Sequence, residues 1–223
     1  MRVELAPWPG KPGRRMCLLD PVTAAAYEEA VEPAVPAIER LLEPWAVGNR
    51  VVALRPLRLE PWREARARYR AIAEREAARA GLALRIDVRE CYRTISAGAV
   101  DAALRAGEVV SEHRGRIAAA LDAFARGGIA GLPVGPAPSA VLANLVLAAA
   151  DRALAGERWL RWVDDLVVFA PDAARLAEAE RRVTTALAAL GLATHPAKRR
   201  TAEGPVAVLR LALATASGGP GAG

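Results

Sequence analysis

The chain has 223 residues, 53% of them hydrophobic and 25% charged, and its formal net charge at neutral pH is +6. This length permits one sizeable core, or one core with a small lobe. The basic balance favours a polyanionic partner such as nucleic acid. Cys17 and Cys91 are far apart in the sequence, so neither a disulfide framework nor a zinc site is indicated.

Nothing in the composition indicates a membrane protein. The N-terminus has no apolar leader segment, and the longest uncharged run, residues 127–150, is broken by glycine and proline in its first half. We expect its helical part to be too short to span a bilayer. We therefore expect a cytoplasmic protein without a membrane partner.

The N-terminal part of the chain mixes extended and helical patterns. Residues 1–21 are expected to be extended around a basic turn at 11–15, and residues 22–45 to be helical with interruptions at two prolines. Residues 46–59 predict a short strand or loop. A strong helix pattern runs over 61–80, from Pro61 to a cap at Gly81. Its arginines and glutamates favour an ion-paired exposed face over a phosphate-binding ridge.

The rest of the chain alternates strands and helices. Residues 82–88 predict a strand with Asp87 near its end, and residues 206–214 predict a final strand. Between them, helices are expected over 97–106, 113–126, 140–154 and 173–190, with Ser96, Ser139 and Asp172 as N-caps of the first, third and fourth. The loop before Ser139 holds glycines and prolines without charge, which suits close approach of its backbone to another group.

The most informative stretch is WLRWVDDLVVFA, residues 159–170. Its aromatic and β-branched residues predict two strands of a hairpin, with Asp164 and Asp165 at the turn. Adjacent carboxylates repel one another unless a cation lies between them, which suggests a Mg²⁺ site. The alternative is an ordinary solvated turn, which the uniformly apolar flanks disfavour.

This order of elements predicts an α+β fold. A strand, helices, a hairpin, a helix and a strand form a split βαβ arrangement, in which helices pack on one face of an antiparallel sheet. The end of the Asp87 strand then lies beside the hairpin turn. Three carboxylates, those of Asp87, Asp164 and Asp165, are expected to converge at one edge of the sheet.

Five segments resemble motifs of the reverse transcriptases, in the order found in that family and over about residues 9–203. They are KPGRRMCLLDP, RIDVRECYRTIS, GLPVGPAPSAVLANLVLAAAD, RWVDDLVVFA and GLATHPAKRR. The similarity is to the prokaryotic enzymes related to retrons, group II introns and abortive-infection systems. The resemblance implies a right-hand polymerase, with a fingers-like region over 1–80, a palm over 81–214 and a disordered tail over 215–223.

The resemblance also implies roles for individual residues. Asp87, Asp164 and Asp165, with the Val88 carbonyl, would hold two Mg²⁺ ions, for which Mn²⁺ could substitute. These ions serve attack of a primer 3′-hydroxyl on a nucleotide phosphate. Lys198, one of only two lysines, would protonate the pyrophosphate or, alternatively, be a solvated cation.

Nucleotide contacts follow from the same resemblance. Arg14 and Arg15 would bind the triphosphate, because arginine makes bidentate phosphate contacts. Tyr92 would exclude a 2′-hydroxyl, although a core aromatic is the alternative. Val134 and Gly135 would lie under the incoming base pair.

Some residues depart from the family pattern. Many members have glutamine where this chain has Val134 and tyrosine where it has Trp162, and Cys91 replaces a usual aromatic or small residue. Little chain follows the last expected palm strand, so no helical thumb is evident. Three alternatives stay open: the chain is a fragment, it borrows a thumb from a partner, or it is weakly processive.

The resemblance implies an RNA-directed DNA polymerase that uses an RNA template, a DNA primer and deoxynucleotides, with a protein or RNA partner supplying a thumb. Two alternatives remain open. One is a nucleotidyltransferase of the same fold that works without a template or makes RNA, and the other is a nucleic-acid-binding subunit with a vestigial site. The sequence leaves the biological role open between defence, mobility and another function.

Overall fold

The computed structural model describes residues 3–8 and 15–215. Its strands are β1 (Val3–Pro7), β2 (Arg15–Leu19), β3 (Val51–Leu54), β4 (Leu57–Leu59), β5 (Leu82–Asp87), β6 (Arg158–Trp162), β7 (Asp165–Ala170) and β8 (Arg200–Glu203). Its helices are α1 (Pro21–Val31), α2 (Val35–Leu41), α3 (Trp62–Ala77), α4 (Cys91–Thr94), α5 (Ala97–Ala106), α6 (Ser111–Arg126), α7 (Ala137–Asp151), α8 (Ala173–Ala189) and α9 (Pro205–Thr215). Arg14, most of the basic turn and the tail from 216 onward lie outside the described residues.

The central sheet has four strands in the order β6-β7-β5-β8, and every neighbouring pair is antiparallel. The predicted hairpin is present as β6 and β7, with a turn at residues 163–164. In the register of β5 and β7, Asp87 is directly opposite Asp165. Two small antiparallel hairpins, β1–β2 and β3–β4, lie outside this sheet.

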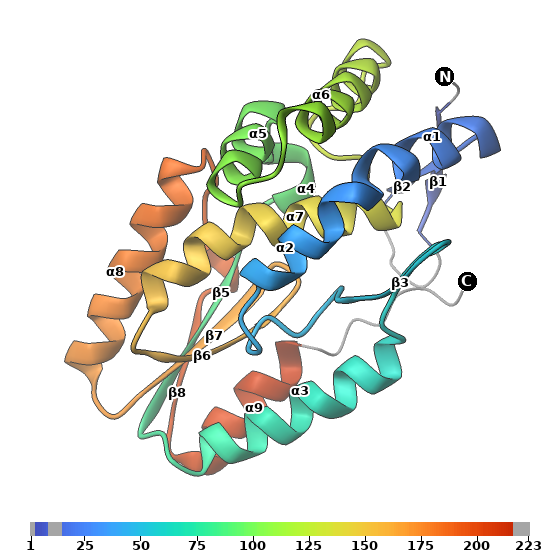
Figure 1. Cartoon of the computed structure of the whole chain (residues 1–223). Helices are drawn as coiled ribbons and strands as arrows, with labels where there is room; N and C mark the ends of the chain where they lie inside the picture. The colour runs from blue at the N-terminus through green and yellow to red at the C-terminus, as the bar shows by residue number, and fades with distance from the viewer. Residues whose placement is uncertain (1–2, 9–14, 216–223) are drawn as a thin grey trace.

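Helices cover both faces of the sheet, so the prediction of helices on one face was wrong (Figure 1). On one face α7 and α8 pack against the side chains of Leu84, Ile86, Leu166 and Val168. On the other face α3 and α9 pack against those of Ala83, Leu160, Val167 and Phe169. The reason is visible in the sequence of β7, where consecutive apolar residues point to both faces and each face must be buried.

The segment predicted as a final strand, residues 206–214, is instead helix α9. Val208, Ala212 and Thr215 are its buried residues, which is helical spacing, and they face α3 and the sheet. A continuous apolar run does not distinguish strand from helix, and length favours a helix here. The edge position next to β5 is taken by β8. Within the described part of the chain, α9 therefore packs on the sheet and does not form a separate lobe.

The predicted helix caps have mixed outcomes. Ser96 and Asp172 do cap α5 and α8, each accepting a hydrogen bond from a backbone N–H three residues later. Ser139 is not a cap, because α7 begins at Ala137 and places Ser139 inside its first turn. Proline is favoured in the first turn of a helix, so Pro138 allows this earlier start. The Ser139 hydroxyl lies 3.0 Å from the Tyr27 hydroxyl in the core.

Gly81 was also predicted as a cap and is not one. Helix α3 ends at Ala77, and the Gly81 N–H donates to the Ala170 carbonyl instead.

Helix α7 with the turn after it, Ala137–Leu154, has the length and composition of a membrane span, contrary to the expectation that it is too short. However, 78% of this segment is buried inside the protein. It is therefore the central core helix, and its apolar character is explained by contacts with α1, α2, α5 and α8.

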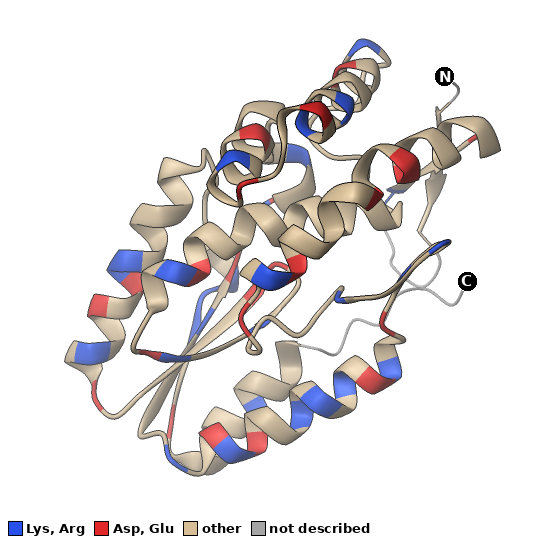
Figure 2. Ribbon diagram, viewed as in Figure 1, with Lys and Arg blue, Asp and Glu red and all other residues tan. Residues whose placement is uncertain are grey.

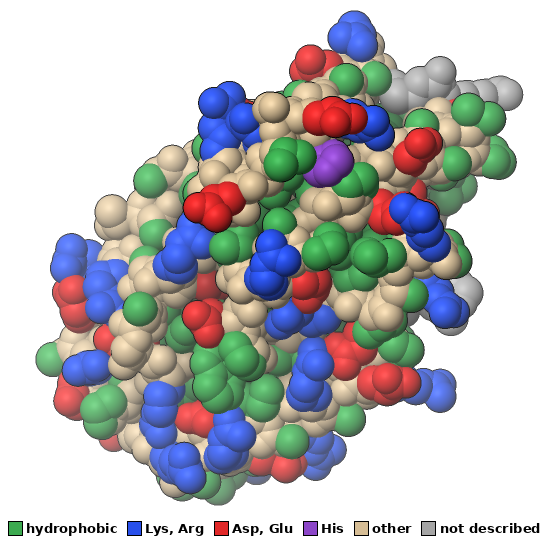
Figure 3. Space-filling model, in the orientation of Figure 1, with side chains coloured by type: hydrophobic (Ala, Val, Ile, Leu, Met, Phe, Trp, Pro, Cys, Tyr) green, Lys and Arg blue, Asp and Glu red, His purple; other side chains and the backbone are tan. Residues whose placement is uncertain are grey.

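Charged side chains on the described surface are largely paired with one another. On α3, Arg68 pairs with Glu60 and Arg70 with Glu74, which supports the ion-paired interpretation of this helix (Figure 2). Figure 3 shows basic and acidic side chains interspersed over the viewed face. The described residues on that face therefore form no single basic patch.

Candidate active site

The acidic residues lie at one edge of the central sheet, where β5 ends and β7 begins. Asp87 is the last residue of β5, Asp165 is the first of β7, and the two are paired in register. Asp164 precedes Asp165 in the turn, and its carbonyl accepts a hydrogen bond from the Val88 N–H at 3.2 Å. The prediction that the Asp87 strand ends beside the hairpin turn is confirmed by this pairing.

Two cationic side chains pair with the Asp87 and Asp165 carboxylates. The Lys198 ammonium lies 2.8 and 3.0 Å from the two carboxylate oxygens of Asp87. The Arg85 guanidinium lies 2.9 Å from Asp165. Lys198 is therefore not a free solvated cation, and it reaches the site from the turn that precedes β8.

Burial is the main influence on the titration of Asp165. The pKa of this carboxyl is raised to about 6, chiefly by burial; Arg85 opposes the rise, and the Asp164 and Asp87 carboxylates add to it. Like charges and desolvation both disfavour the ionised form, so this edge of the sheet favours an added cation.

The three carboxylates share an edge but are distributed over its two sides. Asp165 belongs to the row of Val167 and Phe169, which faces α3 and α9. Asp164 lines a small recess on the opposite side, with residues of α7 and α8. Within residues 3–8 and 15–215, no group of three acidic, histidine or cysteine side chains is arranged to hold a metal ion. Metal binding by Asp87, Val88, Asp164 and Asp165 thus stays a prediction.

Tyr92 lies in the one-turn helix α4, five residues after Asp87, and is half-buried. Its carbonyl accepts a hydrogen bond from the Leu132 N–H at 2.7 Å, which joins it to the glycine–proline loop. Its hydroxyl lies 3.4 Å from the Asn49 side-chain nitrogen. The ring is thus neither a fully buried core aromatic nor free of the surrounding chain, and its role as a sugar gate stays a prediction.

The loop that contains Val134 and Gly135 lies against β2. The Cys17 N–H donates to the Val134 carbonyl at 2.7 Å. Gly135 has a φ of +120°, and a Cβ atom there would lie 3.3 Å from Met16. Only glycine adopts this backbone readily. Arg15 is exposed at the start of the same strand, next to Met16 in the sequence, and Arg14 lies outside the described residues.

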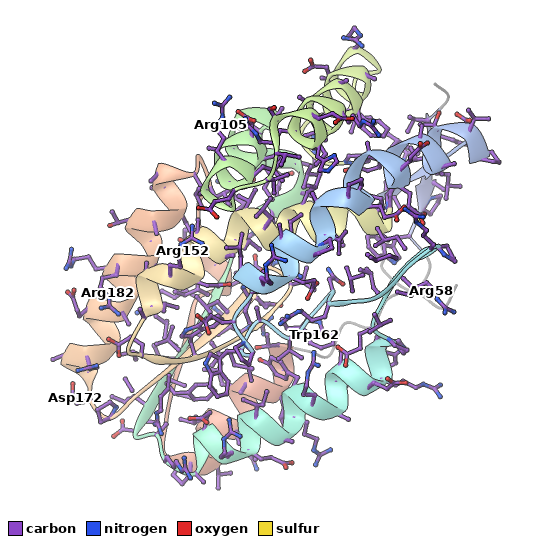
Figure 4. The ribbon with its side chains drawn as sticks, in the orientation of Figure 1. Arg58, Arg105, Arg152, Trp162, Asp172 and Arg182 are labelled. Atoms are coloured by element: carbon purple, nitrogen blue, oxygen red, sulfur yellow. The ribbon has the colours of Figure 1, made fainter. Side chains whose placement is uncertain are left out.

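The sequence did not reveal a buried polar network beneath the turn. Arg161 is only 3% exposed, and its guanidinium contacts both carboxylate oxygens of Asp151, the Asn144 side-chain oxygen and the Val163 carbonyl at 2.7–3.1 Å. A charged residue between apolar residues of a strand, Leu160 and Trp162, was the available signal. Trp162, the next residue, points the other way and lies edge-on to Tyr69 of α3, 5.6 Å between ring centroids (Figure 4).

A segment before β3 completes this network. Residues 45–47 pair with Arg161 along the edge of β6: the Arg161 N–H donates to the Trp45 carbonyl and the Val47 N–H donates to the Arg161 carbonyl, both at 2.9 Å. The Asn144 amide then donates to the carbonyls of Gly48 at 2.9 Å and Asn49 at 3.2 Å. The segment is therefore fixed to both β6 and α7.

The turn itself has a strained residue. Val163 has a φ of +56°, a conformation that is an outlier for a β-branched side chain and costs on the order of 1–3 kcal/mol. Its neighbour Gly48 has no room for a side chain, because a Cβ atom there would lie 2.9 Å from the Val163 nitrogen and from its Cγ2. The surrounding structure must hold this turn in place.

Comparison with known proteins identifies the class to which this fold and site belong. Residues 29–211 match the sequence model of the family described as "Reverse transcriptase (RNA-dependent DNA polymerase)". The match covers most of the chain, so the chain belongs to this family and the predicted resemblance to it is confirmed. The prokaryotic subtype stays a prediction.

One solved structure similar to this chain is a telomerase from Candida albicans in complex with the TWJ fragment of telomeric RNA. It aligns with a TM-score of 0.52 and 11% sequence identity, over 78% of this chain and 34% of the telomerase chain. At this identity the likeness concerns the fold alone, and the chain spans about a third of the neighbour's length. No curated protein sequence matches the chain significantly.

Proposed function

We propose that this chain carries the catalytic centre of an RNA-directed DNA polymerase, with a right-hand palm over 81–214 and a fingers-like region over 1–80. The observation that carries the proposal is the pairing of Asp87 with Asp165 across β5 and β7, with Asp164 in the adjoining turn. Family membership over residues 29–211 supports the same activity.

The proposed cofactor is a pair of Mg²⁺ ions, with Mn²⁺ as a substitute. Asp87, Asp164 and Asp165, together with the Val88 carbonyl, would hold them, because carboxylate and carbonyl oxygens are the ligands that hard divalent cations prefer. The convergence of the carboxylates supports this assignment, because Asp87 is paired in register with Asp165 and Asp164 adjoins it, and Lys198 and Arg85 offset only part of their charge. Bound ions would activate the primer 3′-hydroxyl and stabilise the charge of the leaving pyrophosphate.

The remaining residues bind and orient the nucleotide in this proposal. Lys198, held at the site by Asp87, donates a proton to the leaving pyrophosphate. Arg14 and Arg15 bind the triphosphate, Tyr92 contacts the sugar, and the loop at Val134 and Gly135 lies under the base pair. The contact between Cys17 and Val134 supports a shared nucleotide site, because it joins the strand of Arg15 to this loop.

The proposed substrates are an RNA template, a DNA primer and deoxynucleoside triphosphates. The net charge of +6 supports a nucleic-acid partner. In this proposal a protein or RNA partner supplies the thumb; within the described residues, α9 packs on the sheet. We place the protein in the cytoplasm and among the prokaryotic enzymes of the retron, group II intron and abortive-infection type.

Primer extension by the purified chain tests the proposal. The assay supplies Mg²⁺, a DNA primer, and either an RNA template or none, with deoxynucleotides or ribonucleotides. We expect template-dependent DNA synthesis by the parent and by Asp101→Asn, a control at a partly exposed residue of α5, and none by Asp164→Asn. Synthesis without a template, or of RNA, would favour the alternative nucleotidyltransferase. An inert parent with normal nucleic-acid binding would favour a vestigial site.

A further inference from the structure

The polar network beneath the turn ends at the site itself. The Arg161 guanidinium donates to the Val163 carbonyl at 2.8 Å, in the residue immediately before Asp164. The same Nη1 atom also donates to the Asn144 side-chain oxygen at 2.8 Å. The two contacts fix the strained residue of the turn to the middle of the core helix α7.

We propose that Arg161 and Asn144 are positioning residues, which hold the Asp164 turn in register with the segment of residues 45–49. This inference rests on the proposed function, because it assigns the network a role in placing carboxylates for catalysis. Arg161 and Asn144 are 3% and 2% exposed, so both lie in the core and not at the surface of the site. Both act through the backbone of the turn.

Asn144 connects the Asp164 turn, through Arg161, with the segment of residues 45–49. Its oxygen accepts from Arg161 and its nitrogen donates to the Gly48 and Asn49 carbonyls, so these contacts use both donors and one of the two acceptor positions of this buried amide. Asn49 in turn lies 3.4 Å from the Tyr92 hydroxyl. The network therefore connects the predicted metal-binding turn with the predicted sugar gate.

Gly48 restricts how the Asp164 turn and the segment of residues 45–49 fit together. A Cβ atom at this position would meet the Val163 backbone nitrogen at 2.9 Å, and backbone atoms cannot move aside as a flexible side-chain end can. The turn and the segment therefore fit together only with glycine there. A methyl group would displace the turn, although it would remove no hydrogen bond.

Stability alone gives a weak reason for such a network. Buried ion pairs are often replaced by apolar residues without loss of stability, and their best-attested role is to fix one arrangement. Geometry at a catalytic centre is far more sensitive, since a misplacement of about 1 Å can cost about 10²-fold in rate. The Arg161–Asp151 ion pair lies directly beneath the turn, which fits a role in holding the geometry of the catalytic centre.

The test uses two variants that disturb the register in different ways. Asn144→Asp keeps an acceptor for Arg161 and loses the two donors to residues 48 and 49. Gly48→Ala keeps every hydrogen bond and adds one methyl group. The matched control is Glu157→Gln, because Glu157 is nearly buried, pairs with Arg175 and Arg182, and precedes β6 at the end away from the turn.

Hydrogen–deuterium exchange and primer extension are measured on the full chain. We expect both register variants to accelerate exchange about tenfold in peptides that cover residues 162–166, and to lower kcat by about 10²-fold while KM for the nucleotide changes less than threefold. Glu157→Gln is expected to leave exchange at the turn and kcat at the parent values. Adding Val163→Gly to Gly48→Ala is expected to recover part of kcat, since it removes Cγ2 and suits the positive φ.

The proposal is overturned if both register variants leave exchange at the turn equal to that of Glu157→Gln, or if kcat falls equally in the control. If either Asn144→Asp or Gly48→Ala fails to fold, the measurements on the other variant decide whether the proposal holds. If the parent synthesises nothing on any template, the proposed function fails, while the exchange data still decide whether Asn144 and Gly48 hold the turn.

Discussion

Replacing Arg161 by methionine should destabilise the protein strongly and in a pH-dependent manner. Asp151 is 4% exposed, and its carboxylate receives three hydrogen bonds from Arg161. Arg161→Met leaves this carboxylate buried without a cation, which costs about 3–5 kcal/mol. A domain of this size has a total stability of roughly 5–15 kcal/mol, so the loss is a large share of it.

The pH dependence follows from the titration of Asp151. Burial raises the pKa of this carboxyl, and Arg161 opposes the rise. Without Arg161 the folded-state pKa rises further above the unfolded value of about 3.9. A group with a raised folded pKa stabilises the fold below its unfolded pKa and loses that contribution as pH rises through the window between the two pKa values. The deficit of Arg161→Met should therefore grow with pH, by at most about 1.4 kcal/mol per unit.

Urea unfolding followed by circular dichroism at pH 5, 6, 7 and 8 measures this deficit against the parent. The double variant Asp151→Leu with Arg161→Met is the control, because it removes both charges and should recover most of the stability. A deficit below about 1 kcal/mol, or one that is the same at every pH, would refute the reasoning. A double variant as unstable as the single one would show that packing, and not the unpaired carboxylate, causes the loss.

Two further predictions concern nucleic acid and nucleotide binding. Tyr92→Ala should raise the use of ribonucleotides relative to deoxynucleotides in single-nucleotide extension, because it removes the ring expected beside the sugar; an unchanged ratio would place the gate elsewhere. Binding of primer–template by this chain alone should weaken steeply with salt, with a slope of roughly −0.9 per neutralised phosphate on B-form duplex. Extension with an excess of unlabelled duplex as a trap should then give short products, and long products at moderate salt would reveal a clamp.

The acidic edge of the sheet was predictable because its signals are local. Aromatic and β-branched residues on both sides of Asp164 and Asp165 fixed a hairpin, and a strand pattern that ends at Asp87 placed the third carboxylate. Caps at Ser96 and Asp172 were equally local, since a side chain bonds a backbone N–H three residues later. Such features need only a few neighbouring residues.

The features that were missed depend on contacts between distant segments. Residues 206–214 form a helix because α3 offers it an apolar face, and nothing within that run reveals this face. The network at Arg161 joins segments 96 residues apart, from Gly48 to Asn144. A buried arginine predicts some partner, but only the fold shows that the partners are Asp151 and Asn144.

Lys198, Arg85 and Arg161 are the three cationic side chains discussed at this site, and they differ in how exposed they are to solvent. Lys198 and Arg85 pair with Asp87 and Asp165 from positions where their side chains are 42% and 21% exposed, so solvent or a ligand can compete for them. Arg161 is saturated by buried acceptors and cannot leave Asp151 without leaving an uncompensated charge in the core. Under the proposed function, Lys198 and Arg85 are counter-ions that binding of metal and nucleotide can displace, whereas Arg161 stays in place. The carboxylates can then exchange cations while the backbone of the turn keeps its position.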